Sequence, residues 1–224
     1  MTLPTCDLSG TPVQYAKITF PYYGVFHADV TLVTQTEPTG TQTLTFLGMQ
    51  MTCSVVRAIS FVGSRGVRLV GGFGGWRTVV PAKQFSNAAG LKASTVVMLT
   101  AMEVGEKANI PASSDFIVGT NGVTYARSNG KASLVLNDPA IFDTAWWMDI
   151  TGTVQITPRP STLITSDFVC QAVTGAAGIY TVATETPSDW LPGRKFQSST
   201  VNGQINRVQH TVEGTKVRTE VMVS

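Results

Sequence analysis

Residues 204–223 read QINRVQHTVEGTKVRTEVMV, and this stretch decides the class of fold. From residue 216 to residue 223, long or charged side chains (Lys, Arg, Glu, Met) alternate with β-branched ones (Val, Thr, Val, Val). A period of two residues is typical of a strand with one buried and one accessible face. The pattern predicts two strands, 204–212 and 215–223, joined as a hairpin through Glu213-Gly214.

The same period recurs from Val13 to Val80, in short segments separated by turn residues. About six strands are predicted in these seventy residues, which indicates a small antiparallel barrel or sandwich. A hairpin is expected between segments 28–32 and 44–46, with residues 38–40 (PTG) as its loop. The glycines of residues 71–76 (GGFGGW) favour a sharp bend or a close approach of two backbones.

The period changes in residues 91–107, LKASTVVMLTAMEVGEK. Ser94 is the expected N-cap of a helix of about three turns, and Gly105 is its expected left-handed stop. A strand at 122–127, a short helix from Lys131 and a hairpin at 145–156 complete an α+β unit that ends in the linker 158–160 (PRP).

These segments predict a mostly β chain with a small α+β insertion, in which small antiparallel β-barrels or sandwiches flank the α+β unit. The predicted domains are an N-terminal barrel-like domain (1–80), the α+β domain (81–158) and a C-terminal barrel-like domain (159–224).

The composition favours a protein whose surface is covered by partners. Charged residues make up 13% of the chain, the mean hydropathy is +0.14 and the net charge is +2, whereas an average soluble protein has about 25% charged residues. The basic residues are scattered and form no run that would follow a phosphate backbone, which disfavours nucleic-acid binding. Three widely spaced cysteines indicate reduced thiols rather than disulfides or a zinc site. Synthesis in a cytoplasm is expected, with no signal peptide and no membrane-spanning segment.

Few residues suit catalysis. His27 lies near Asp29 and could meet Cys53 across a sheet, but an ordinary strand-end histidine and a buried thiol are the preferred interpretation. His210 is interpreted as a cross-strand hydrogen-bonding or interface residue. Residues 71–75 lack the Lys-Ser/Thr of a phosphate loop. We therefore expect no enzyme, with no catalytic, cofactor-binding or metal-binding residues.

Two groups of residues leave alternatives open. Asp138, Asp143 and Asp149 crowd near Trp146 and Trp147, which suggests a sugar-stacking platform; the preferred alternative places one tryptophan in the core and the other beside an interface. A second group carries excess positive charge between residues 50 and 80, and it would fit an acidic neighbouring subunit, a polar channel wall or a solvated sheet face. Its members are Arg57, Arg65, Arg68 and Arg77.

The order of elements resembles the baseplate-hub (late-control or tail-tip) proteins of tailed bacteriophages. The resemblance rests on three short motifs. They are Glu103-Val104-Gly105-Glu106 after the helix, the hairpin motif with Trp146, Trp147, Asp149, Gly152, Thr153 and Val154, and the C-terminal hairpin with Arg207, Val208, His210, Arg218, Thr219 and Val221.

The resemblance implies a structural virion protein of the tail baseplate. Such a protein would form a homo-oligomeric ring, expected to be a trimer, that joins the tail tube to the central spike. DNA or the tape-measure protein would pass through its lumen without sequence-specific binding. The candidate assembly-interface residues are Trp76, Arg77, Trp147, Arg207, His210 and Arg218. The alternative is a carbohydrate- or receptor-binding β module of a phage tail, with Trp146, Trp147 or Trp190 as stacking platforms.

Overall fold

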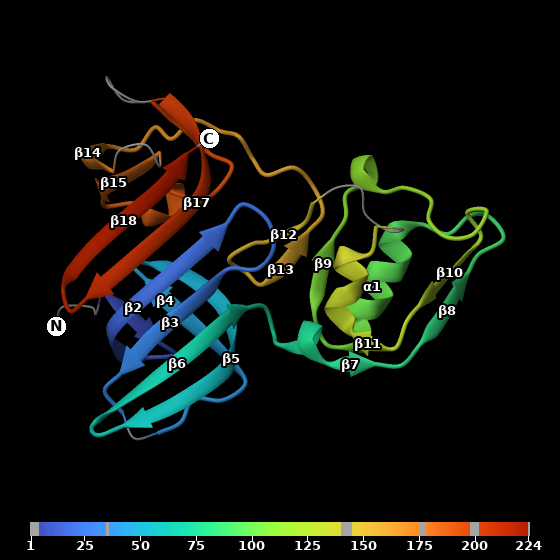
Figure 1. The fold of residues 1–224 in the computed structure, drawn as a ribbon, viewed down its shortest axis with the longest axis horizontal. Coiled ribbons are helices and arrows are strands. Elements are labelled where there is room, and N and C mark those ends of the chain that lie inside the picture. The colour runs from blue at the N-terminus through green and yellow to red at the C-terminus, as the bar shows by residue number, and fades with distance from the viewer. Residues whose placement is uncertain (1–4, 35, 140–144, 175–177, 198–201, 224) are drawn as a thin grey trace.

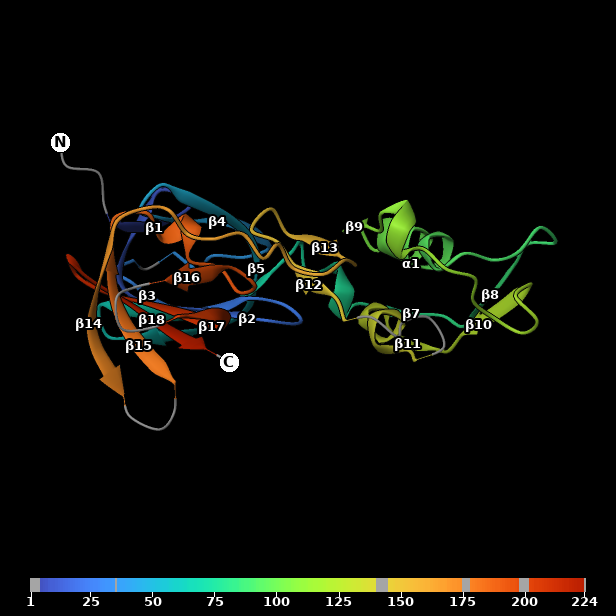
Figure 2. The ribbon, with the colours of Figure 1, turned by 90° about the horizontal axis from the view of Figure 1, so that it is seen from above.

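The computed structural model describes residues 5–34, 36–139, 145–174, 178–197 and 202–223. The main element of the structure is one large sheet, and a smaller α+β unit extends from one side of it (Figures 1 and 2).

Six strands of the N-terminal segment close into a barrel. They are β1 (Cys6–Leu8), β2 (Thr11–Pro21), β3 (His27–Leu32), β4 (Thr41–Phe46), β5 (Met49–Phe61) and β6 (Ser64–Gly71). Their order is β1-β4-β5-β6-β3-β2, and β1 pairs with both β4 and β2, which completes the circle. The expected hairpin between 28–32 and 44–46 is wrong, because β3 pairs with β2 and β6 whereas β4 pairs with β1 and β5.

The alternating sequence explains which side chains fill the barrel. On β3, Ala28, Val30 and Leu32 are at most 2% exposed, while His27 and the other alternate residues are half-buried on the outer face. Burial of each larger apolar side chain, such as Val30 or Leu32, contributes roughly 1.5–3 kcal/mol to the free energy of folding. A shift of the strand by one residue would expose these side chains, so their burial fixes its register.

The C-terminal strands extend the same sheet rather than closing a second barrel apart from it. They are β14 (Phe168–Thr174), β15 (Ile179–Thr184), β16 (Lys195–Gln197), β17 (Asn202–Glu213) and β18 (Lys216–Val223). β17 pairs with β2 along Tyr15–Pro21, and β18, β15 and β14 follow in order, giving 11 strands in all. The mostly β class with an α+β insertion is confirmed. The division into three domains stays a prediction, and hydrogen bonds between β2 and β17 join its first and third segments.

The α+β insertion packs short elements around one helix. Its helices are α1 (Ala93–Glu103) and the 3-10 turns η1 (Gly75–Arg77), η2 (Ala112–Ser114) and η3 (Ala132–Asn137); another 3-10 turn, η5 (Pro187–Asp189), lies in the C-terminal segment. Its strands are β7 (Val79–Val80), β8 (Lys83–Ser86), β9 (Lys107–Asn109), β10 (Thr124–Arg127), β11 (Gly130–Lys131), β12 (Trp147–Met148) and β13 (Thr153–Gln155).

The helix ends only partly as predicted. Ser94 lies inside α1 and does not cap it; instead, its backbone N–H and hydroxyl donate to the carboxylate of Asp115, at 3.0 and 2.8 Å. The carboxylate of Asp115, which lies in a distant loop, therefore accepts an N–H group at the start of the helix, as a local N-cap side chain would. Gly105, with φ 69°, takes the predicted left-handed conformation after the helix.

The Gly-rich bend connects the barrel to the insertion, and Glu106 holds it. The buried carboxylate of Glu106 accepts backbone N–H groups from Phe73, Gly75 and Trp76, at 3.2, 2.6 and 3.3 Å. A Cβ on Gly75 would lie 1.9 Å from the carbonyl oxygen of Val104, so the predicted close backbone approach is confirmed. Burial raises the pKa of Glu106, and the backbone donors oppose that rise.

Candidate interaction surface

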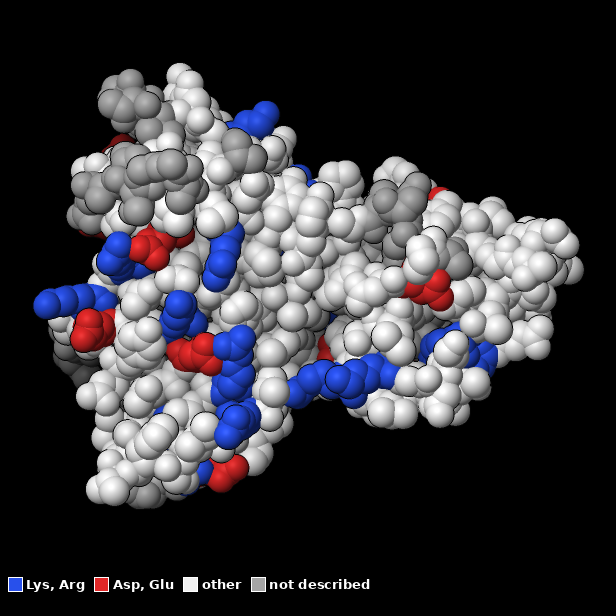
Figure 3. Space-filling model, in the orientation of Figure 1, with Lys and Arg blue, Asp and Glu red and all other residues white. Residues whose placement is uncertain are grey.

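The outer face of the large sheet carries many charged side chains. Charged side chains gather over β2, β3, β6, β17 and β18, while much of the remaining surface in this view is uncharged (Figure 3). They come from the alternate positions that point away from the barrel interior, as Lys17 and Asp29 do from neighbouring strands. The two-residue period thus directs the apolar set inward and the charged set outward.

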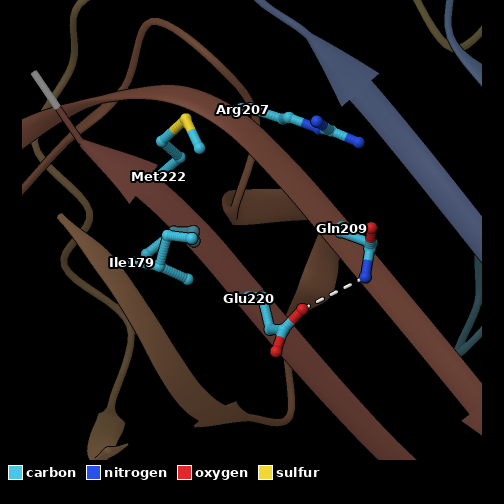
Figure 4. Close-up of a pocket in the computed structure, with 6 residues that line it drawn as sticks. Ile179, Arg207, Gln209, Glu220 and Met222 are labelled. Carbon is cyan, nitrogen blue, oxygen red and sulfur yellow. Dashed lines mark hydrogen bonds between the residues drawn. The ribbon is translucent and has the colours of Figure 1, made fainter. Parts of the chain in front are cut away.

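A hollow of about 110 Å³ lies on this face between β15, β17 and β18. It is lined by Ile179, Arg207, Gln209, Glu220, Val221 and Met222. The amide of Gln209 donates to Glu220 at 3.1 Å, and Arg218 pairs with the same carboxylate at 2.6 Å. Figure 4 shows the Arg207 side chain extending along the sheet instead of toward Glu220. Among the described residues Arg207 has no ion-pair partner, so its guanidinium can receive an anionic group from outside.

Two of the predicted interface residues, Arg207 and Arg218, lie on this outer face, and His210 does not. His210 is three positions from Arg207 on β17, so its side chain points into the barrel, where it is fully buried. Its Nδ1 is 2.9 Å from the Thr219 hydroxyl, and its ring packs against Phe20 and Phe46. The cross-strand hydrogen bond is as predicted, but assignment to an assembly surface does not fit a side chain with no exposed area.

The predicted pair Trp76 and Arg77 lies at the bend between barrel and insertion. Trp76 is buried in η1, and its backbone N–H donates to the carboxylate of Glu106. Arg77 is exposed and donates to the carbonyl oxygen of Val55 at 3.2 Å. Only Arg77 of this pair has an exposed side chain.

Trp147 forms part of an internal joint. Its indole N–H donates to the carbonyl oxygen of Thr157 at 2.9 Å, and the Arg159 guanidinium lies 4.3 Å from its ring centre. Arg159 in turn donates to the carbonyl oxygens of Pro21 and Tyr22, at 2.9 and 2.5 Å. Burial lowers the pKa of Arg159 to about 10, which leaves it charged at neutral pH.

The tryptophans do not form a sugar platform in the described structure. Trp190 is fully buried, one face of Trp147 is covered by Arg159, and the Trp146 indole N–H donates to Asn137 at 3.1 Å. The nearby acids also have structural partners. Asp149 accepts N–H groups of its own hairpin turn and Asp138 accepts the Tyr125 hydroxyl, while Asp143 lies outside the described residues.

The groups considered for catalysis do not converge. His27 and Asp29 lie on the outer face of β3, whereas Cys53 points into the barrel with no exposed area. Burial raises the pKa of the Cys53 thiol to about 12, so it stays protonated at neutral pH. The backbone N–H groups of residues 73–76, which a phosphate would need, are used by Glu106.

Within the described ranges, no three His, Cys, Asp or Glu side chains are grouped as metal ligands would be. In the same ranges, no helix has both the length and the hydropathy needed to span a membrane.

Comparison with known proteins gives a match in structure only. No family model matches the sequence, and no curated protein matches it. The 43 kDa tail protein of prophage MuSo2 from Shewanella oneidensis is similar with a TM-score of 0.65 and 12% identity, over 98% of this chain and 96% of that one. The tail protein from Neisseria meningitidis MC58 has a TM-score of 0.60 and 11% identity, over 98% and 95% of the two chains.

A third similar structure comes from a secretion system. The E. coli c3393 protein, described as a type VI secretion component that is structurally similar to the T4 tail proteins gp27 and gp5, has a TM-score of 0.56 and 11% identity. The match covers 98% of this chain and 76% of that one. At these identities the likeness concerns the fold. The barrel, the insertion and the C-terminal strands together share the fold of these tail proteins.

Proposed function

We propose that this chain is a structural protein of the phage tail baseplate hub. In this role it forms a homotrimeric ring that joins the tail tube to the central spike and surrounds the channel for DNA or the tape-measure protein. The observation that carries the proposal is the extent of the fold likeness, because it includes 98% of this chain and nearly all of two tail proteins. The role is structural rather than catalytic.

One open sheet edge and one exposed apolar hairpin turn support assembly into a ring. At one end, β14 pairs only with β15 among the described residues, so one edge of β14 keeps its hydrogen-bonding groups available. Elsewhere, at the turn of the β5–β6 hairpin, Phe61 and Val62 are exposed; Figure 1 shows that this hairpin lies away from β14. Because these surfaces differ, a contact between them is heterologous, and repeated heterologous contacts close into a ring when the rotation permits.

The test is the oligomeric state of the purified chain and of one edge variant. The wild-type protein is expected to sediment as a species of three times the 23.9 kDa of one chain, and to show a central hole in electron micrographs. Val169 is 64% exposed on β14, and Val169→Lys is expected to yield monomers because a charge on an edge strand opposes pairing.

Val79→Lys is the matched control. Val79 is 66% exposed but lies in β7 of the insertion, away from the sheet edge, so this variant is expected to form the ring. A wild-type protein that remains monomeric, alone and with tail-tube protein, contradicts the proposal. Equal loss of assembly in both variants contradicts the role of β14.

A further inference from the structure

A second hollow, of about 230 Å³, lies on the outer face of the sheet over four neighbouring strands, β2, β3, β6 and β5 (Figure 1). The register of these strands places Gly66 of β6 between Ile59 of β5 and Thr31 of β3. Tyr15 of β2 lies next in the same line, opposite Thr31. Because glycine has no side chain, the surface is hollowed at Gly66. We call this opening the Gly66 hollow.

The walls of the Gly66 hollow are apolar. Tyr15, Ile59 and Phe61 line it, and these side chains are 37%, 41% and 59% exposed. The ring of Phe61 lies over Gly66, since a Cβ added to the glycine would be 3.2 Å from the Cε2 atom of that ring. Three large apolar side chains that are open to solvent around one hollow indicate an interaction site, whereas single exposed ones do not.

One side of the hollow carries a cation that lacks an acidic partner. Arg57 lies directly opposite Arg68 in the register of β5 and β6, and like charges in such a pair are destabilising. Asp29 forms an ion pair with Arg68. Arg57 is exposed, and no ion pair joins it to an acid of the described residues. A carboxylate from a partner would therefore complete this group of charges.

The edge of β5 beside the hollow is open. β4 pairs with β5 only as far as Ser54. From Arg57 to Phe61, β5 pairs with β6 alone within the described ranges. An extended chain can add to such an edge through backbone hydrogen bonds. Aromatic side chains reach diagonal neighbours about 7–8 Å away, so a ring placed beside Ile59 can enter the hollow.

We infer that the Gly66 hollow and this edge bind an extended segment of a different protein, in which an aromatic and an acidic residue are two positions apart. Side chains two positions apart in an extended chain share one face and are separated by about 6.8 Å. Ile59 and Arg57 have the same spacing, so the ring enters the hollow while the carboxylate meets Arg57. Tyr15 and Phe61 then provide ring contacts, which aromatic side chains favour. The inference goes beyond the proposed ring because it names another kind of partner.

The described surface of a second copy does not offer this pair of side chains. Among the described residues, the exposed aromatic side chains are Tyr15, Tyr23 and Phe61. No acidic residue lies two positions from any of them in the sequence. The hollow is also smaller than the pockets of about 300–1,000 Å³ that enclose small molecules. These observations favour a segment of another protein.

The experiment selects binders from a library of random eight-residue peptides displayed on filamentous phage, with the purified wild-type chain as the target. We expect enrichment of peptides in which an aromatic residue and Asp or Glu are two positions apart. The most enriched peptide is then synthesised and titrated against two variants. Arg57→Glu, which removes the ion pair, and Gly66→Leu, which fills the hollow, are each expected to weaken its binding about tenfold.

Each variant has a matched control. Lys131→Glu makes the same charge change at an exposed residue of the insertion. Thr43→Leu introduces a leucine at an exposed residue of β4, which does not line the hollow. Both controls are expected to bind the peptide as the wild type does. A peptide in which Lys replaces the acid should bind Arg57→Glu more tightly than it binds the wild type, which separates lost charge complementarity from lost folding.

The inference is overturned if the selection yields no such motif, or if the enriched peptide binds Arg57→Glu and Gly66→Leu as tightly as it binds the wild type. Equal weakening in the variants and in their controls also overturns it.

Sedimentation of the same samples separates this inference from the proposed function. Wild-type rings that select no such peptide refute the inference and leave the hub proposal intact. If those rings fall to monomers in Gly66→Leu, a second copy fills the hollow instead. Wild-type monomers that select the motif, and lose the peptide in Gly66→Leu, refute the ring and leave the inference.

Discussion

At the residue scale, His210 is a polar side chain that packs inside the hydrophobic core of the barrel. The ring is fully buried, one nitrogen meets the Thr219 hydroxyl, and its Nε2 has no hydrogen-bond partner among the described residues. Because a charged imidazolium has no compensating carboxylate there, burial lowers the pKa of His210 to about 3. The histidine is therefore neutral in the folded barrel at all ordinary pH values.

This burial predicts a specific acid sensitivity. Below pH 6.5 the unfolded chain binds a proton at His210 and the folded chain does not, so the free energy of unfolding falls as pH falls from 6.5 toward 3. Between pH 7.0 and 5.5 the loss is about 1 kcal/mol. His210→Leu is expected to remove that part of the pH dependence in urea unfolding experiments, whereas His27 contributes equally to both proteins. Identical pH dependence in the two proteins would refute this assignment.

At the element scale, the end of α1 and the bend after β6 form one packed unit. The carboxylate that follows the helix accepts the N–H groups of the bend, and the helix-end carbonyl of Val104 lies where a side chain on Gly75 would project. Neither segment can move without breaking contacts in the other. This unit fixes the path of the chain from the barrel into the insertion.

Gly75→Ala is expected to destabilise the chain by about 3 kcal/mol, because the added Cβ meets backbone that cannot rotate away. The comparison is Gly214→Ala in the β17–β18 turn, where nothing lies within 4 Å and only the positive φ of 59° opposes the change. That variant is expected to lose about 1 kcal/mol. Urea unfolding measures both, and a Gly75→Ala variant no less stable than Gly214→Ala would contradict the close packing.

At the scale of the whole molecule, Arg159 joins its own linker to two other parts of the chain. It lies in the linker after the insertion, donates to the carbonyl oxygens of Pro21 at the end of β2 and of Tyr22 directly after it, and covers Trp147 of β12. Among the described residues no carboxylate is paired with it, so its charge is balanced by carbonyl oxygens and aromatic faces. The barrel, the insertion and the linker after the insertion therefore meet at one side chain.

Arg159→Gln is expected to lower the free energy of unfolding by roughly 2–3 kcal/mol, since it removes two charge-assisted hydrogen bonds and a cation–π contact. Limited proteolysis of the native protein should then cut faster near residues 157–163. Arg77→Gln, which loses one exposed hydrogen bond, is expected to change stability by less than about 0.5 kcal/mol. Equal effects of both changes would show that Arg159 does not hold the joint.

The sequence was sufficient for local structure and insufficient for pairing. Alternation along β3 and β18 and the glycine after α1 predict the elements, because side-chain period and positive φ are local properties. Which strands lie side by side depends on the whole core, so the predicted partner of segment 28–32 is wrong and the β2–β17 pairing was not foreseen. For the same reason, the sequence alone does not indicate that Lys17 lies in line with Arg68 and Arg57, because only the register of the strands aligns them.

The pairing of β2 with β17 also bears on how the chain folds. The ribosome makes β2 early. The strand that pairs with its edge, β17, is made only after the whole of the intervening chain. Such distant contacts make closure slow, because a long loop must be ordered before it gains any stabilising pairs. Until then β2 has an open edge that can pair with another nascent copy, so rapid synthesis at high temperature should favour aggregates over native protein.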